Sequence, residues 1–191
     1  MTASFPIAVF VSGNGSNLQA ILEKVSVAVV ISDNPHAYAL ERASQAGIPA
    51  FTFERKNYAT RKDFEEAIVT KLHEYKIELI CLAGFMRMIG KTLLSAFPKR
   101  IINIHPSLLP QFPGLNAVQQ ALDAKVTETG CTVHVVDEKM DNGPILAQAR
   151  IPVLSSDTLT SLSKRIHTEE HRIYPQVIAE IVSQKIRLDA L

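Results

Sequence analysis

Apolar and polar residues follow two different patterns along the first half of the chain. Short, almost continuous apolar runs predict strands that are buried on both faces, as in a parallel sheet. These runs are Ile7 to Ser12, Val25 to Ile31, Pro49 to Phe53, Leu79 to Ala83 and Arg100 to His105. Between them, apolar residues recur at helical spacing, which predicts helices from Asn17 to Lys24, Tyr38 to Ala46 and Thr60 to Tyr75. Thr60 and Asp63 form a variant capping box at the start of the last of these helices. This strand–helix order predicts an α/β doubly wound sheet with right-handed crossovers.

The second half of the chain is less regular. A short helix is predicted from Ala117 to Leu122, and the runs from Thr129 to Val136 and Ile145 to Pro152 are close enough to pair as antiparallel strands. The segment from Leu159 to about Lys185 has helical character, which Pro175 is expected to interrupt or kink. Because no repeat or linker divides the sequence, we predict one Rossmann-like domain over residues 1–191. Its sheet is expected to be mostly parallel, with an antiparallel portion in the C-terminal half.

Composition narrows the class of protein. The 191 residues carry 20 Lys and Arg against 19 Asp and Glu, so a net charge of +1 gives no electrostatic reason to expect nucleic acid or an acidic membrane as a partner. Hydrophobic residues make up 47% of the chain, which is enough for a large core. Cys81 and Cys131 lie in apolar segments rather than in a disulfide framework, and no apolar run is long enough to span a bilayer. We therefore expect a cytoplasmic protein that binds small molecules, as a monomer or as a homodimer.

A glycine-rich turn, Ser12 to Asn17, lies where the first predicted strand enters the first helix. Glycines allow a tight turn, and the free N–H groups at a helix start attract an anion. A P-loop would end in Gly-Lys-Ser or Gly-Lys-Thr, and no Lys is present here. The dinucleotide fingerprint would place a third glycine where Leu18 stands, although Asp33 is placed like its ribose-binding acid. We therefore favour a phosphate monoester over a pyrophosphate; the alternative is a turn that binds nothing.

Asn103 and His105 close the last of the predicted parallel strands and lie on the same side of it. An amide beside an imidazole can stabilise an oxyanion and move protons, and ligands bind at the carboxyl ends of α/β strands. Asp141, in the turn between the later strands, would favour a protonated imidazole if it lay nearby. The alternatives are a hydrogen-bonded pair at a strand end and a turn aspartate with a local role. A metal site made from His105, His134, Asp137 and Asp141 lacks compact ligand spacing, and His134 is more typical of a structural histidine, so no metal is predicted.

A series of motifs gives the chain a specific resemblance. In order, they are Val11-Ser-Gly-Asn-Gly-Ser-Asn-Leu-Gln-Ala20, Leu82-Ala-Gly-Phe-Met-Arg87, Asn103-Ile-His-Pro-Ser-Leu-Leu-Pro110, Asp141-x-Gly-Pro-Ile145 and Glu169-Glu-His-Arg-Ile-Tyr-Pro175. With them, the chain resembles the phosphoribosylglycinamide formyltransferases of the folate formyltransferase superfamily over nearly its whole length. The resemblance implies an enzyme of purine (IMP) biosynthesis that transfers a formyl group from 10-formyltetrahydrofolate to the amine of 5-phosphoribosylglycinamide. The folate would be a cosubstrate, so neither a permanently bound cofactor nor a metal is implied.

The resemblance also implies roles for individual residues. Asn103, His105 and Asp141 would be catalytic in a direct acyl transfer, with the first two stabilising the oxyanion and Asp141 supporting His105 and a proton-carrying water. The ribonucleotide would be bound by Gly15, Ser16, Asn17, His167, Thr168, Glu169 and Glu170. The folate would be bound by Arg61, Met86, Arg87, Met88, Ile89, Asn103, Asp137, Glu138, Lys139, Met140 and Asp141.

Some features depart from the pattern of this family. The stretch from Asn17 to Val25 is short, and Asn116 and Val118 stand where some relatives carry histidines.

Other functions within the superfamily would require additional sequence features. A formyltetrahydrofolate hydrolase would usually add an N-terminal regulatory domain, and a methionyl-tRNA formyltransferase would add a C-terminal tRNA-binding domain. A nucleotide or folate sensor on the same scaffold would not need the catalytic residues.

Overall fold

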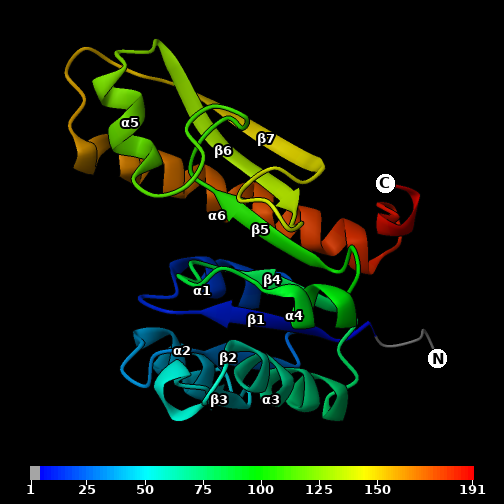
Figure 1. Cartoon of the computed structure of the whole chain (residues 1–191). Helices are drawn as coiled ribbons and strands as arrows, with labels where there is room; N and C mark the ends of the chain where they lie inside the picture. Colours follow the sequence, from blue (N-terminus) through cyan, green and yellow to red (C-terminus); the bar gives the residue numbers. More distant parts are fainter. Residues whose placement is uncertain (1–4) are drawn as a thin grey trace.

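The centre of the molecule is a seven-stranded sheet in the order β3-β2-β1-β4-β5-β6-β7. The computed structural model describes residues 5–191. Its strands are β1 (Ile7–Val11), β2 (Val29–Ser32), β3 (Ala50–Thr52), β4 (Leu79–Leu82), β5 (Ile101–His105), β6 (Glu128–Val135) and β7 (Ile145–Pro152). The strands from β1 to β5 pair in parallel, whereas β6 pairs antiparallel with both β5 and β7. The predicted α/β sheet with an antiparallel C-terminal portion is confirmed (Figure 1).

Helices cover both faces of this sheet. They are α1 (Ser16–Leu22), α2 (Tyr38–Gln45), α3 (Arg61–Glu74), α4 (Lys91–Ala96), α5 (Ala117–Asp123) and α6 (Leu159–Val182), with short 3-10 turns at η1 (Arg55–Asn57) and η2 (Leu188–Ala190). The predicted capping box opens α3, because the Thr60 side chain accepts from the Asp63 N–H and the Asp63 carboxylate accepts from the Thr60 N–H. No helix between residues 5 and 191 combines the length and the apolar character that crossing a bilayer requires.

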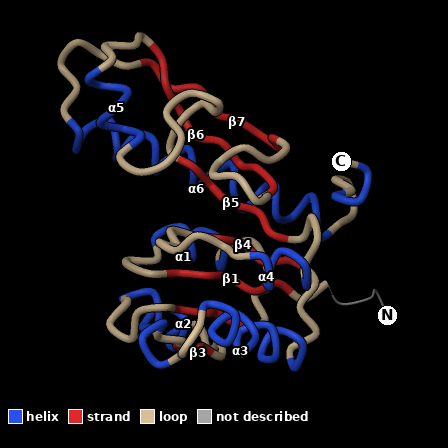
Figure 2. The backbone as a smooth tube through the Cα atoms, in the orientation of Figure 1, coloured by secondary structure: helices blue, strands red, loops and turns tan. Residues whose placement is uncertain are grey.

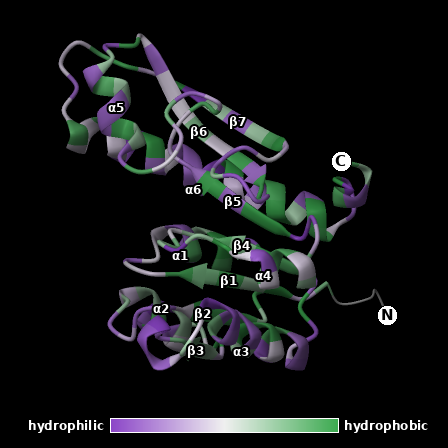
Figure 3. Cartoon of the chain, viewed as in Figure 1, coloured by the Kyte–Doolittle hydropathy of each residue, from purple (hydrophilic) through white to green (hydrophobic). Residues whose placement is uncertain are grey.

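The alternation of side chains along β1 divides the core into two layers. Ile7, Val9 and Val11 pack on the side that holds α1, α2 and α6, whereas Ala8 and Phe10 pack on the side that holds α3 and α4. In Figure 3 the hydrophobic colour follows the central strands, and α2, α3 and α5 carry long stretches of the hydrophilic colour. Burial of both faces explains why the parallel strands are almost continuously apolar in sequence.

One part of the sheet is covered by loops instead of helices. In β5, Ile102 and Ile104 belong to the core layer of α6, so Asn103 and His105 point to the opposite side. Over that side lie the loop before α5 and the loop between β6 and β7, which come together in Figure 2. They are joined by a hydrogen bond of 2.8 Å from the Gly114 N–H to Asp141. The candidate catalytic residues therefore lie beneath two loops rather than beneath a packed helix.

One strand boundary was wrong, one helix was missed, and one expected helix interruption is not found. Strand β2 begins at Val29 instead of Val25, because the segment before it, although it buries Val27, lies outside the sheet ladder. Helix α4 was not predicted, since its N-cap is Gly90, and its first amides are capped by the distant carboxylate of Glu65. Helix α6 is continuous from Leu159 to Val182, so Pro175 does not interrupt it, and a kink at Pro175 stays a prediction.

Candidate active site

The residues predicted to be catalytic come together on the loop-covered side of β5. Asp141 Oδ2 lies 3.4 Å from His105 Nδ1, and Asp141 Oδ1 lies 3.6 Å from Nε2 of His134. Asn103 pairs with His134 across the antiparallel β5–β6 ladder, and its Nδ2 is 3.3 Å from His134 Nε2. The structure thus joins Asn103, His105 and Asp141 into one cluster and adds His134, which sequence reasoning had assigned a structural role.

His134 was missed because its position depends on strand register. It is 2% exposed, and its Nδ1 lies 3.0 Å from the carbonyl of Val135. Its Nε2 faces both the Asn103 amide, at 3.3 Å, and the carboxylate of Asp141, at 3.6 Å. The period-two pattern of β6 does place His134 on a definite face, but only the pairing with β5 puts it opposite Asn103. No signal in the sequence gives that pairing.

The imidazole of His105 lies between two acceptors. Its Nε2 is 2.9 Å from the carbonyl oxygen of Phe112, and its Nδ1 faces the carboxylate of Asp141. A carbonyl and a carboxylate can only accept hydrogen bonds, so the ring offers a donor to both only in its doubly protonated form. The side chain is 5% exposed, which strengthens these electrostatic interactions relative to those in water. Both neighbours would complement a positive charge that develops on the ring during a reaction.

Asp141 is held in its ionised form. Burial by itself would raise the pKa of this carboxyl, but His134, the Gly114 N–H and the nearby His105 outweigh it and keep the pKa below its usual value. The residue has a φ of 49°, in the left-handed region, where the turn directs its side chain back towards β5. A carboxylate at this point complements the imidazole of His105.

The glycine-rich turn between β1 and α1 is shaped for close packing. Gly15 is the N-cap of α1 with a φ of 76°, and a Cβ at this position would lie 2.6 Å from the Cβ of Ala39. The residue before Gly15, Asn14, is held by Arg42, whose Nε donates to the Asn14 carbonyl at 2.9 Å. Because Gly15 provides no side-chain cap, the N–H groups in the first turn of α1 are available to an external acceptor. This is the arrangement that binds a phosphate.

Helix α6 faces this turn with a buried acid and two histidines. Glu170 is 3% exposed, and its Oε2 accepts from Asn17 Nδ2 at 3.0 Å and from His167 Nδ1 at 2.9 Å. The hydrogen bond to Glu170 raises the pKa of His167 above its usual value. Desolvation lowers the pKa of the neighbouring His171, whose ring is stacked on that of His167 at 6.3 Å between centroids.

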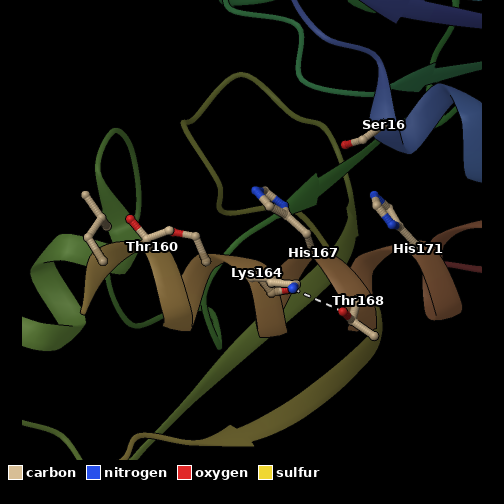
Figure 4. Close-up of a pocket in the computed structure, with 8 residues that line it drawn as sticks. Ser16, Thr160, Lys164, His167, Thr168 and His171 are labelled. Atoms are coloured by element: carbon tan, nitrogen blue, oxygen red, sulfur yellow. Dashed lines mark hydrogen bonds between the residues drawn. The ribbon is translucent and has the colours of Figure 1, made fainter. Parts of the chain in front are cut away.

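A pocket of about 540 Å³ opens between the start of α1 and this face of α6. It is lined by Ser16, Leu159, Thr160, Ser163, Lys164, His167, Thr168 and His171. Figure 4 shows the rings of His167 and His171 and the hydroxyl of Ser16 directed into the space between the two helices. Glu169, also predicted to bind the ribonucleotide, is instead paired with Arg172 at 2.6 Å and does not line the pocket. A groove with histidines, a lysine and helix-start amides suits an anionic ligand.

The predicted folate residues divide into two loops, one helix position, Arg61, and one strand position, Asn103 in β5. Arg61, at the start of α3, donates from Nη2 to the Met88 carbonyl at 2.5 Å and from Nε to Glu65 at 3.0 Å, and about half of its side chain is exposed. Met86, Met88 and Met140 are all about half exposed or more, at 70%, 49% and 51%, whereas Ile89 is buried. Exposed methionines on facing loops form an adaptable apolar surface, which suits a flat aromatic ligand.

The loop from Asp137 to Asp141 ends in the cluster of Asn103, His105 and Asp141. Asp137 Oδ1 accepts from the Lys139 N–H at 2.8 Å, which closes the loop on itself. Glu138 and Lys139 are exposed at its tip. Between residues 5 and 191, no three His, Cys, Asp or Glu side chains are arranged to hold a metal ion. Through Asp141, this loop lies next to His105 at the edge of the cluster.

Asp33 does not have the role that the dinucleotide alternative would give it. Its Oδ1 accepts from the Ser12 hydroxyl at 2.5 Å and its Oδ2 accepts from Arg87 Nε at 2.6 Å. Both carboxylate oxygens thus accept from protein groups that hold the side chain between β1 and the loop after β4. The phosphate-monoester alternative fits this arrangement better.

Comparisons with known proteins identify the family. The model of the formyl transferase family matches residues 6–178 of the chain. The chain belongs to this family. It is 50% identical over 92% of its length to phosphoribosylglycinamide formyltransferase of Bacillus subtilis (strain 168), and it covers 93% of that protein. It superimposes with a TM-score of 0.94 and 48% identity on the crystal structure of glycinamide ribonucleotide transformylase 1 from Symbiobacterium toebii, covering 96% of this chain and 90% of that one. It is also 41% identical over 95% of its length to the human trifunctional purine biosynthetic protein adenosine-3, of which it spans 19%.

Proposed function

We propose that this chain transfers a formyl group from 10-formyltetrahydrofolate to the amine of 5-phosphoribosylglycinamide, a step in purine (IMP) biosynthesis. The observation that carries the proposal is the buried cluster of Asn103, His105 and Asp141, with Asp141 Oδ2 3.4 Å from His105 Nδ1. A protein that only bound nucleotide or folate would not need this cluster. The two bacterial relatives described above are named phosphoribosylglycinamide formyltransferase and glycinamide ribonucleotide transformylase 1, and the chain matches them over nearly all of both lengths.

The ribonucleotide is assigned to the groove between α1 and α6. The turn of Gly15, Ser16 and Asn17 binds the phosphate with its amides, and His167 adds a positive charge when it is protonated. Glu170 lies within hydrogen-bonding distance of both Asn17 and His167, so it orders the site and offers a carboxylate to the ribose or glycinamide. Thr168 lines the same groove, whereas the ion pair of Glu169 with Arg172 leaves Glu169 a peripheral role.

The folate is assigned to the loops on the other side of the cluster. The loop from Met86 to Ile89 and the loop from Asp137 to Asp141 present backbone groups and exposed methionines to the pterin and its neighbouring ring. Arg61 and Arg87, at the outer end of this surface, suit the negatively charged glutamate tail. The folate acts as a cosubstrate that leaves after each turnover, so no permanently bound cofactor and no metal take part.

The reaction proceeds as a direct acyl transfer. The amine of the ribonucleotide attacks the formyl carbon, and the carbonyl oxygen becomes an oxyanion that is stabilised by the amide of Asn103 and the imidazolium of His105. Asp141 supports that charge and orients a water molecule, which takes the proton from the attacking amine, while N10 of the folate leaves with a proton. His134 fixes the Asn103 amide in the orientation that the oxyanion requires. Since Nε2 of His105 is engaged by the Phe112 carbonyl, that loop carbonyl gives way when the formyl oxygen arrives.

The test is a formyl-transfer assay with both substrates, repeated with each one omitted. Product formation must require both, and His105→Ala must lower kcat by a factor of about 10² to 10⁴ while the affinity for the ribonucleotide changes little. Release of formate without the ribonucleotide would identify a hydrolase instead. The cytoplasmic, homodimeric form of the enzyme is a separate part of the proposal, tested by sedimentation velocity and by fractionation of the cells that express it.

A further inference from the structure

A chain of hydrogen bonds links three segments at the carboxyl ends of β1, β2 and β4. The Ser12 hydroxyl donates to Asp33 Oδ1 at 2.5 Å and accepts from the Met86 N–H at 2.9 Å. The second oxygen of Asp33 accepts from Arg87 Nε at 2.6 Å. We call this arrangement of Ser12, Asp33, Met86 and Arg87 the Ser12–Asp33 bridge. Since Ser12 has a single hydroxyl proton, it can serve both neighbours only with Asp33 as the acceptor and Met86 as the donor.

The two ends of the bridge lie in the two proposed substrate sites. Ser12 is the first residue of the glycine-rich turn, and its carbonyl accepts from Asn34 Nδ2 at 3.0 Å, which fixes it to the end of β2. Met86 and Arg87 open the loop assigned to the folate. The Asp33 side chain is 9% exposed, so it lies beneath both segments and outside the space that either substrate would occupy.

The folate loop needs this support at Met86 and Arg87, whereas Phe85 just before them packs edge-on against Phe10 in the core. Met86 is 70% exposed, and its side chain is therefore of little use for fixing the loop. The other end of the loop is held independently, by Glu65 through the Gly90 N–H at 2.7 Å and by Arg61 through the Met88 carbonyl. Removing the Ser12–Asp33 bridge would thus release Met86 and Arg87, while Phe85 on one side and Met88 to Gly90 on the other stay in place.

We propose that Asp33 is a positioning residue, which holds the folate loop in register with the ribonucleotide turn through Ser12 and Arg87. The inference rests on the proposed function, because the two segments are its two substrate sites. A carboxylate is suited to this task since its two oxygens can accept from different segments at the same time. The substitution Asp33→Asn would keep one acceptor oxygen for Ser12 and would remove the charge opposite Arg87.

The experiment compares Asp33→Asn and Ser12→Ala with a matched control, Glu128→Gln. The control also removes one carboxylate charge from an arginine, Arg150, at the end of β6 that is remote from the cluster. Steady-state kinetics with both substrates varied should show that KM for 10-formyltetrahydrofolate rises about tenfold in Asp33→Asn, the factor that one hydrogen bond to a charged group typically contributes. The same KM should rise in Ser12→Ala, and kcat and KM for the ribonucleotide should stay within about twofold of the wild type in Asp33→Asn. Glu128→Gln should match the wild type in all three.

A second readout does not depend on turnover. Hydrogen exchange at the Met86 amide should be faster in both bridge variants and unchanged in the control, because the amide loses its acceptor or that acceptor loses its anchor. An unchanged folate KM in both folded variants, or equal changes in both KM values and in kcat, would overturn the inference. If Asp33→Asn does not fold, Ser12→Ala decides by the same measures. If the wild type transfers no formyl group, the proposed function fails, and Met86 exchange together with tetrahydrofolate affinity still decides whether Asp33 positions the loop.

Discussion

Replacing Asp141 by Asn tests the electrostatic core of the mechanism. The substitution keeps the size of the side chain and removes the charge that faces His105 Nδ1 at 3.4 Å. At that distance and an effective dielectric constant of about 20, the attraction between a carboxylate and an imidazolium is about 5 kcal/mol. The carboxamide oxygen would retain part of this attraction as a dipole. We therefore expect a loss of about 3 kcal/mol in the transition state, or roughly a hundredfold in kcat.

The assay is steady-state formyl transfer at saturating concentrations of both substrates, with the fold checked by circular dichroism. Asp189→Asn is the control. It too neutralises a carboxylate that has a basic partner, here Arg100 at 2.8 Å, but Asp189 lies on the exposed C-terminal turn. The control should keep wild-type kcat. If folded Asp141→Asn protein kept kcat within about threefold of the wild type, the charge of Asp141 would not support the imidazolium during the reaction, and the mechanism would have to be abandoned.

Other predictions concern the ribonucleotide site and the core behind it. Gly15→Ala should raise KM for the ribonucleotide by about tenfold or more, because the new Cβ would collide with Ala39; an unchanged KM would show that the turn does not bind the phosphate. The pKa of His167 is raised by Glu170, so the phosphate contact is complete below the usual histidine pKa and is lost as the pH rises through the raised value. KM for the ribonucleotide should therefore increase as the pH rises above about 6.5 in the wild type and stay flat in His167→Gln; equal increases in both would contradict the assignment. Tyr174→Phe should lower the free energy of unfolding by about 1 to 3 kcal/mol in urea titrations, since the buried hydroxyl lies within 3.2 Å of carbonyls on β4 and β5; no change would mean that water satisfies them.

Local signals in the sequence were enough for most of the fold. The apolar run of β1 and the capping box of α3 each depend on neighbouring residues, and both were found where the pattern placed them. Helix α4 was missed for the opposite reason. Its cap is the carboxylate of Glu65, which belongs to a different helix and has no fixed spacing to Gly90 in sequence. The start of β2 was misjudged because Val27 is buried by packing alone, which sequence periodicity does not distinguish from strand pairing.

The site shows the same difference between features set by neighbouring residues and features set by long-range contacts. Period-two alternation correctly placed Asn103 and His105 on one face of β5. The approach of Asp141 depends on how the loop between β6 and β7 folds back, and the position of His134 depends on antiparallel register; neither is a local property of the sequence. Asp33 shows the limit of motif matching, since its place after β2 fits a ribose-binding acid although both of its oxygens contact protein groups.

The proposed substrate cleft would have two walls, a ribonucleotide wall and a folate wall. These are built from different kinds of structure, which has a consequence for inhibitor selectivity. The ribonucleotide wall is carried by α6, a helix of 24 residues whose other face is buried in the core. The folate wall consists of short loops with exposed methionines. Compounds that imitate the sugar phosphate will bind to a rigid site, so small changes in their shape will lower their affinity. Antifolates will meet a pliable surface that tolerates varied ring systems, so discrimination among related enzymes is better sought on the side of α6.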